Sequence, residues 1–169
     1  MHVRPGQPED AENLTALAIQ VWLHTYATQG ISSTISSYVL SEFTPKRFAA
    51  LLSEPTSALF VAEKDDNLLG YAVVKGDTPC PVRSASKSEL ATLYVQGPFM
   101  GKGVGALLLK QAERWAMERA GTSVWLKTNP QNSRAIAFYA KHGYTKVGIT
   151  FFELGGEKYK NLVLVGRDA

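Results

Sequence analysis

The most constraining feature of the sequence is a glycine-rich turn that joins an apolar strand to a long amphipathic helix. Residues 89–95 have the composition and alternation of a β-strand, and residues 104–119 repeat their apolar side chains at helical spacing. Between them, Gly101, Gly103 and Gly105 occupy alternate positions. Closely spaced glycines let backbone N–H groups approach a phosphate, and the start of the helix adds unpaired donors and partial positive charge. The turn therefore predicts an anion site, and the alternative is a tight turn that only requires positive φ angles.

Two common phosphate-binding motifs do not fit this turn. A P-loop needs Gly, four residues and then Gly-Lys-Ser/Thr, but Gln96 stands five residues before Gly101 and Gly103 follows Lys102. The dinucleotide fingerprint is met from Gly101 only in its looser form, which ends at Ala106, and the segment comes late in the chain. The P-loop is therefore excluded and the dinucleotide site is weakly supported, which leaves another kind of phosphate site or a purely structural turn.

The rest of the chain reads as a mixture of strands and helices without repeats or linkers. We expect a short edge strand at residues 3–5, strands over 58–64, 68–75, 123–128, 144–154 and 157–165, helices over 8–27, 44–55 and 133–142, and a loop with a short helix over 30–44. Gly155-Gly156 is a hairpin turn signal between the last two strands. This order predicts one mixed α+β domain over residues 1–169.

Composition excludes several classes of protein. With 45% hydrophobic and 20% charged residues, the chain has a globular balance, and its one cysteine, Cys80, rules out an internal disulfide framework or a Cys-rich zinc site. No apolar run approaches the roughly 20 residues that cross a bilayer, and the N-terminus lacks the apolar core of a signal peptide. The three histidines show no metal-ligand spacing. We expect a cytoplasmic protein with no catalytic metal and no membrane contact.

The charge is distributed unevenly along the chain. Residues 1–85 hold six basic and nine acidic residues, and residues 86–169 hold twelve and six, giving −3 and +6. A basic half suits a polyanion such as a nucleotide cofactor or a nucleic acid, and the alternative is a solvated surface. Because the basic residues are spread over several elements and no recognition module is visible, we expect no nucleic-acid partner.

Two motifs in the C-terminal half resemble those of the GNAT superfamily of acetyl-CoA-dependent N-acetyltransferases. Residues 89–109, ELATLYVQGPFMGKGVGALLL, are similar to the central strand and pyrophosphate loop of that family. Residues 129–144, NPQNSRAIAFYAKHGY, are similar to its N-x-x-A-x-x-F-Y-x-x-x-G-F/Y segment. The resemblance implies a central twisted mixed sheet of about six to seven strands flanked by about four helices. Within the superfamily, the chain loosely resembles the branch of spermine/spermidine-type acetyltransferases. Met100 departs from the pattern, because it stands at the Q/R position of the loop and offers only its backbone N–H.

The resemblance also implies how acetyl-CoA is held. The backbone of Leu93, Tyr94 and Val95 would pair with the pantetheine arm, and the N–H of Val95 would face the thioester carbonyl. Asn132, at the start of the last helix, would bond the same arm. The cradle of the pyrophosphate would be formed by Met100, Gly101, Lys102, Gly103, Val104, Gly105 and Ala106.

Two residues are candidates for catalysis of acetyl transfer to an amine. In the resemblance Tyr139 is the general acid to the departing sulfur, and a phenol with a usual pKa of about 10 is a reasonable proton donor to a thiolate. The alternative for Tyr139 is an ordinary core aromatic. Glu89 is the candidate general base, acting through a water, and its alternative is a strand-start glutamate that makes an ion pair.

The N-terminal half supplies candidates for the acceptor side. Aromatic residues suit a polyamine or an aromatic amine through cation–π or stacking contacts, although rings at such positions also build cores. These candidates are Trp22, Tyr26, Tyr38 and Phe43. The resemblance further implies a homodimer formed through the final hairpin and exposed strand edges. A second function remains open, a catalytically idle acyl-CoA-binding sensor or interaction module, which Met100 alone favours.

Overall fold

The strands of the computed structural model, which describes residues 1–82, 84–154 and 156–167, form one mixed sheet of seven strands. The strand order is β1-β2-β3-β4-β5-β7-β6, with β4 and β5 parallel and β5, β7 and β6 antiparallel. The elements are β1 (His2–Pro5), α1 (Ala11–Tyr26), α2 (Ser33–Glu42), α3 (Pro45–Leu52), β2 (Ser57–Lys64), β3 (Asn67–Lys75), β4 (Glu89–Val95), α4 (Val104–Ala120), β5 (Trp125–Thr128), α5 (Ser133–Lys141), β6 (Thr145–Leu154) and β7 (Glu157–Val165). The predicted fold class is confirmed.

The contacts of the chain separate into two compact units. The first comprises Met1–Val73 and Thr92–Gln111, and the second comprises Val74–Ala91 and Ala112–Ala169. Strands β3 and β4 and helix α4 each contribute residues to both units. In the part of the chain that the structure describes, no helix has the length and the apolar character needed to cross a membrane.

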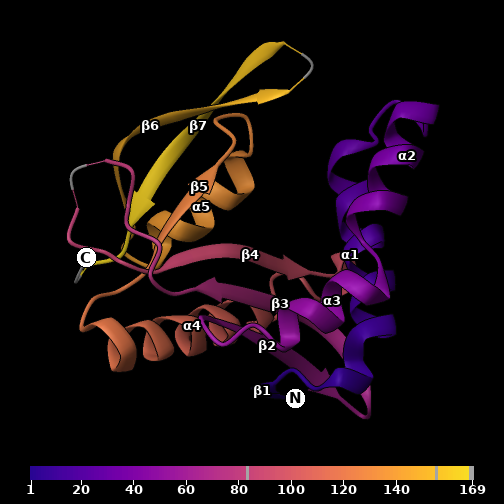
Figure 1. Cartoon of the computed structure of the whole chain (residues 1–169), viewed down its shortest axis with the longest axis horizontal. Helices are drawn as coiled ribbons and strands as arrows, with labels where there is room; N and C mark the ends of the chain where they lie inside the picture. The colour runs from indigo at the N-terminus through magenta and orange to yellow at the C-terminus, as the bar shows by residue number, and fades with distance from the viewer. Residues whose placement is uncertain (83, 155, 168–169) are drawn as a thin grey trace. The chain divides into compact units, whose positions relative to one another are not determined.

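The first unit buries one face of α1 against the strands beside it in Figure 1. Leu14, Leu17 and Val21 recur three or four residues apart, so they lie on one side of the helix. Alternate residues of β2 and β3 face the same core, together with Phe48 of α3. The core of this unit consists of Ala11, Leu14, Leu17, Ala18, Val21, Phe48, Leu59, Val61, Tyr71 and Val73.

Two helices of the first unit, α2 and α3, begin at side-chain caps, and α2 is longer than expected. Thr44 accepts a hydrogen bond from the N–H of Arg47 at 3.2 Å, which confirms the predicted start of α3. The segment predicted as a loop with a short helix instead holds the ten-residue helix α2. Ser32 accepts from the N–H of Ile35 at 3.3 Å, so a serine interpreted as a loop residue caps this helix.

A close approach between strands fixes the position of β4 in the first unit. A Cβ at Gly70 of β3 would lie 2.5 Å from the carbonyl oxygen of Tyr94 and 3.3 Å from Cδ1 of Leu108. Only glycine leaves room for this contact. Gly70 therefore lets β3 pack against the strand and the helix on either side of the glycine-rich turn.

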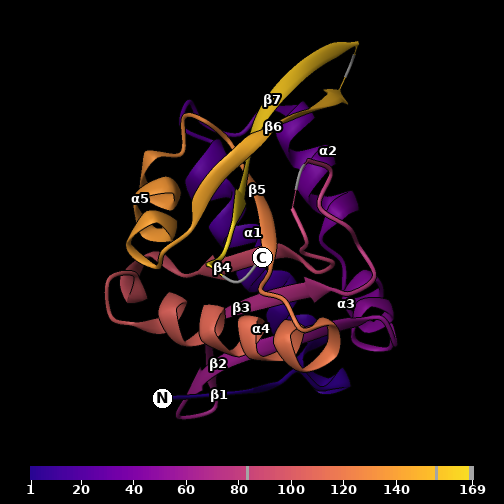
Figure 2. The same ribbon diagram turned by 90° about the vertical axis from the view of Figure 1, so that its left-hand side faces the viewer.

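The second unit is built on the antiparallel strands β5, β7 and β6, of which β6 and β7 form the hairpin seen in Figure 2. The loop before β4 packs on this sheet, because Cys80 and Val82 contact the buried cluster of Trp125, Val163 and Val165. The indole N–H of Trp125 donates to the carbonyl of Thr78 at 2.7 Å. Of the predicted turn, Gly155 lies outside the described residues and Gly156 has a φ of +83°.

Candidate active site

The glycine-rich turn has the backbone conformation that its sequence predicts. Gly101 and Gly103 adopt φ angles of +74° and +85°, which side chains strongly disfavour. A Cβ at either position would meet no heavy atom of the described residues within 4 Å. Glycine is therefore required at these positions by the positive φ angle and not by contact with neighbouring atoms. The space beside the backbone is open. The two interpretations of the turn are compatible, because a tight turn of this kind also leaves its N–H groups accessible.

The start of α4 supplies hydrogen-bond donors next to the turn. The N–H of Leu107 donates to the carbonyl of Gly103 at 3.1 Å, so the helical bonding begins there. The N–H groups of Val104, Gly105 and Ala106 precede that bond and have no partner within the helix. A helix of 17 residues also carries about half a positive charge at this end. These donors fit a pyrophosphate.

The charge on the turn comes from Lys102, and Met100 contributes less than the sequence suggested. The backbone N–H of Met100 donates to the carbonyl of Gly97 at 3.2 Å, so it is already used within the turn. Lys102 is exposed and is the only charged side chain of residues 96–106. Its ammonium lies 5.7 Å from the centroid of the Phe99 ring, a cation–π contact.

The end of β4 leads into this turn and also faces aromatic residues of the helices. Leu93, Tyr94 and Val95 are half-buried. The Tyr94 ring lies 5.6 Å from that of Tyr71. Burial raises the pKa of Tyr94 above its usual value, and the nearby groups of Tyr26, Tyr38 and Glu42 raise it further.

Trp22, Tyr26, Tyr38 and Phe43, which we call the aromatic cluster, lie together in the first unit. The Trp22 ring is 4.9 Å from the Tyr26 ring and 4.9 Å from the Tyr38 ring, and Tyr38 meets Phe43 edge to face at 6.4 Å. Tyr26 and Tyr38 are 48% and 40% exposed, whereas Phe43 packs against the core. Core packing therefore accounts for Phe43, and the two tyrosines present their rings to solvent.

Helix α5 of the second unit carries Asn132 and Tyr139. The side-chain oxygen of Asn132 accepts from the N–H of Ala135 at 3.1 Å, which confirms Asn132 as the predicted cap. Tyr139 is buried against Tyr144, with ring centroids 5.5 Å apart. Burial raises the pKa of Tyr139 above its usual value of about 10, so its hydroxyl keeps its proton at neutral pH.

Glu89 begins β4 and is paired with a lysine that the sequence did not single out. The carboxylate is buried and lies 3.1 Å from the ammonium of Lys127 on β5. The parallel register aligns Glu89 with Trp125. Lys127 lies two residues beyond Trp125 on β5, so its side chain is on the same face of the sheet as that of Glu89. Lys127 is 42% exposed and lies 5.6 Å from the Trp125 ring. The ion pair considered as the alternative role of Glu89 is therefore present.

Comparison with known proteins agrees with this geometry. The model of the acetyltransferase (GNAT) family matches residues 21–144. An uncharacterized N-acetyltransferase of Mycobacterium tuberculosis is 31% identical over 157 residues, which cover 92% of this chain and 96% of that protein. A spermidine N(1)-acetyltransferase of Thermoplasma acidophilum is 26% identical over 148 residues, covering 85% of this chain and 88% of that protein.

Solved structures share the fold. The crystal structure of the PaiA N-acetyltransferase from Thermoplasma acidophilum in complex with coenzyme A has a TM-score of 0.78 at 23% identity, covering 98% of this chain and 97% of that one. A GCN5-related N-acetyltransferase from Rhodopseudomonas palustris has a TM-score of 0.73 at 22% identity, covering 97% and 93% of the two chains.

The fold, the open glycine turn and the comparisons together define an acyl-coenzyme A-dependent transferase. The chain belongs to the acetyltransferase (GNAT) family. It is an acetyl-CoA-dependent N-acetyltransferase, which transfers an acetyl group to an amine. The enzymatic interpretation is thus favoured over the idle acyl-CoA sensor that Met100 alone suggested.

Proposed function

We propose that the chain acetylates a primary amine, of a small molecule or of a protein, by direct attack of the amine in a ternary complex. The observation that carries this proposal is the open, positive-φ turn at the N-terminus of α4. The donors assigned to the pyrophosphate are the backbone groups of Gly101, Gly103, Val104, Gly105 and Ala106. Lys102 supplies the formal positive charge. Met100 contributes only to the conformation of the turn, because its N–H is already bonded to Gly97.

The remaining contacts to the donor are assigned to β4 and Asn132. Acetyl-CoA supplies the activated acetyl group as a thioester. The backbone of Leu93, Tyr94 and Val95 pairs with the pantetheine arm, and the N–H of Val95 stabilises negative charge on the carbonyl oxygen. The side-chain oxygen of Asn132 already accepts the hydrogen bond that caps α5. Its amide NH₂ group is therefore the donor assigned to the same arm.

Tyr139 and Glu89 are assigned the two proton transfers. Tyr139 protonates the departing sulfur, a role that requires the phenol to be protonated at neutral pH, as a tyrosine is. Glu89 accepts the proton of the attacking amine through a water. The buried position of its carboxylate supports this assignment, because burial shields a base from competing solvent.

The role of Glu89 predicts a change in pH dependence. We expect Glu89→Gln to lower kcat/KM by about tenfold or more, with the largest loss at the acid end of the profile, where the amine most needs a base. The pH–rate profiles of the two proteins measure this. Lys127→Met is the matched control, because it breaks the same ion pair but keeps the carboxylate. Superimposable profiles of Glu89→Gln and wild type would remove Glu89 from this role.

The aromatic cluster is assigned to the acceptor amine. Exposed rings suit a cation, and the similarity to a spermidine acetyltransferase supports a cationic amine. We expect Tyr38→Ala to raise KM for the amine by about three- to tenfold while leaving KM for acetyl-CoA unchanged. Tyr159→Ala is the control, because Tyr159 is similarly exposed at 41% but lies on β7. Equal effects of the two substitutions on amine KM would refute the assignment.

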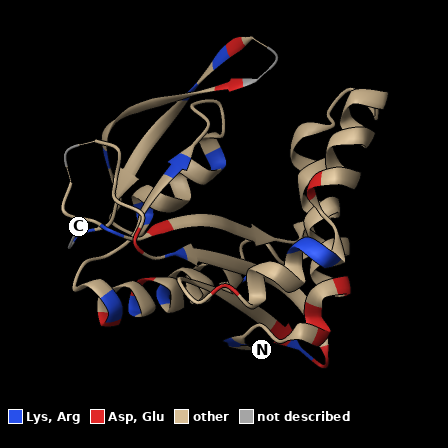
Figure 3. Cartoon of the chain, in the orientation of Figure 1, with Lys and Arg blue, Asp and Glu red and all other residues tan. Residues whose placement is uncertain are grey.

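We further propose that the enzyme is a cytoplasmic homodimer without nucleic-acid, membrane or catalytic-metal partners, and that residues 1–169 act as one domain. The exposed apolar residues Ile149, Phe151 and Phe152 of β6, which is an edge strand, support self-association. Basic side chains are spread over α4, α5 and the hairpin in Figure 3, which does not favour nucleic acid. Light scattering is expected to give twice the 18.4-kDa chain mass; a monomer would refute the dimer.

A further inference from the structure

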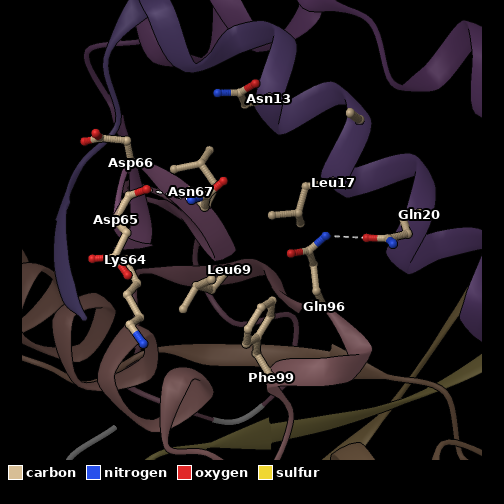
Figure 4. A pocket seen from close by; sticks show the side chains of 12 residues that line it. Asn13, Leu17, Gln20, Lys64, Asp65, Asp66, Asn67, Leu69, Gln96 and Phe99 are labelled. Carbon is tan, nitrogen blue, oxygen red and sulfur yellow. Dashed lines mark hydrogen bonds between the residues drawn. The ribbon is translucent and has the colours of Figure 1, made fainter.

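The first unit has a pocket between α1, the β2–β3 turn and the turn after β4, and no residue of the aromatic cluster lines it (Figure 4). Its volume is about 790 Å³, within the range of sites for small organic molecules. The lining residues are Asn13, Ala16, Leu17, Gln20, Lys64, Asp65, Asp66, Asn67, Leu68, Leu69, Gln96 and Phe99. None of them has a role in the proposed acetyl transfer.

The floor of this pocket is apolar and its walls carry side-chain amides. Leu17 and Leu69 are buried, and the half-buried Phe99 ring lies beside Leu69 in Figure 4. Asn13, Leu17 and Gln20 are spaced four and three residues apart, so one face of α1 forms a wall. A hydrogen bond between the side chains of Gln96 and Gln20 ties this wall to the turn after β4.

The charge at the pocket is negative. Asp65 and Asp66 form the β2–β3 turn with φ angles of 51° and 60°, and Lys64 is the only cation among the lining residues. An apolar floor with an aromatic ring, amide oxygens and excess carboxylates is suited to a small organic cation.

Phe99 belongs both to the pocket and to the turn that precedes the glycines. Its ring lines the pocket, and the ammonium of Lys102 lies 5.7 Å from its centroid. A ligand that packs on the Phe99 ring would therefore contact the same ring as Lys102, the residue that we assign to the pyrophosphate. Contact between Lys102 and a phosphate would withdraw the lysine from Phe99 and leave more of the ring to the ligand.

We propose that this pocket binds a small organic cation with an apolar body, and that its occupancy is coupled to the glycine-rich turn through Phe99 and Lys102. The coupling, but not the pocket itself, rests on the proposed role of the turn in holding coenzyme A. Because coupling between two ligands is reciprocal, the cation and coenzyme A raise each other's affinity by the same factor.

Calorimetric titration of the full-length protein with benzyltrimethylammonium tests the site. This probe has no N–H group, so it cannot be acetylated, and its binding is independent of turnover. In the Tyr38→Ala variant, whose aromatic cluster lacks one ring, we expect saturable one-to-one binding that Phe99→Leu and the double variant Asp65→Asn/Asp66→Asn each weaken by about fivefold or more. Asparagine tolerates positive φ, so the double variant keeps the turn while removing its charge. Unsaturable binding, or unchanged affinity in both variants, would overturn the site.

Matched controls and a second titration complete the test. Phe152→Leu and Asp77→Asn repeat the substitutions at exposed positions outside the pocket and are expected to leave the probe affinity unchanged. With saturating coenzyme A, we expect the probe to bind about twofold or more tightly, and this gain to vanish in Lys102→Met. An equal affinity with and without bound coenzyme A would overturn the coupling. A protein that binds the probe but not coenzyme A would instead refute the proposed cofactor turn.

Discussion

Replacement of Tyr139 by phenylalanine is expected to lower kcat by about a hundredfold or more, because general acid catalysis typically contributes that much. The substitution removes one hydroxyl and keeps the ring that packs on Tyr144. We therefore expect the loss to appear in kcat, with KM for acetyl-CoA and for the amine nearly unchanged. Steady-state kinetics with both substrates varied, together with thermal unfolding of the same samples, measure this.

Tyr144→Phe is the matched control for this prediction. Tyr144 is a second buried tyrosine of the same unit, and its hydroxyl donates to the carboxylate of Glu113 at 2.9 Å. Its loss is expected to cost roughly 0.5–1.5 kcal/mol of stability, the net worth of a typical hydrogen bond, without a comparable loss of kcat. If both variants lost kcat equally, Tyr139 would be a packing residue and the sulfur would receive its proton from elsewhere.

The raised pKa of Tyr139 also fixes the sign of a pH effect. Burial disfavours the phenolate, so Tyr139 keeps its proton to a higher pH than a free tyrosine. The active form of a general acid is the protonated one. We therefore expect no loss of kcat due to Tyr139 below about pH 10, the usual tyrosine pKa.

Gly103→Val is expected to weaken acetyl-CoA binding by about tenfold or more, because several backbone donors of the cradle are displaced together. Gly103 has a φ of +85°, and valine is strained there even though its side chain would enter open space. We also expect a loss of stability of about 1–3 kcal/mol from the strained backbone. Titration with coenzyme A and thermal unfolding separate the two effects.

Gly121→Val provides the control for backbone strain. Gly121 ends α4 with a φ of +67° and, like Gly103, has no described heavy atom within 4 Å of a Cβ position. The same substitution there is expected to cost similar stability while leaving the affinity for coenzyme A unchanged. A parallel loss of affinity in both variants would mean that strain, rather than the cradle, controls binding.

Local signals in the sequence predicted much of the fold and part of the site. The helix starts at Thr44 and Asn132 were predictable because capping depends on residues three positions apart in the chain. The turn at Gly101 and Gly103 was recognised for a similar reason, since φ is a property of single residues. By contrast, the serines around α2 favour both loops and helix caps, and only packing of Val39 distinguishes these outcomes.

Features that depend on pairing between distant segments were not predictable from one sequence. Lys127 reaches Glu89 because β4 and β5 are aligned in one parallel register, and no local pattern specifies that register. The hydrogen bond of the Met100 N–H depends on the short turn that precedes it, which the sequence showed only as rich in Gly and Pro. Exposure of Tyr26 and Tyr38 likewise depends on how α1 meets α2.

The most direct test of the account is thiol release from acetyl-CoA with a panel of acceptors, comparing the wild-type protein with Tyr139→Phe. The panel contains polyamines, amino acids, aminoglycosides and peptides with free N-termini. We predict amine-dependent release with one acceptor class, strongest for cationic amines, and a loss of about a hundredfold in the variant. If thiol release depended on the amine but was equal in wild type and variant, the catalytic role of Tyr139 would be contradicted. If the protein bound acetyl-CoA but released no thiol with any amine, the proposed acetyl transfer would be contradicted.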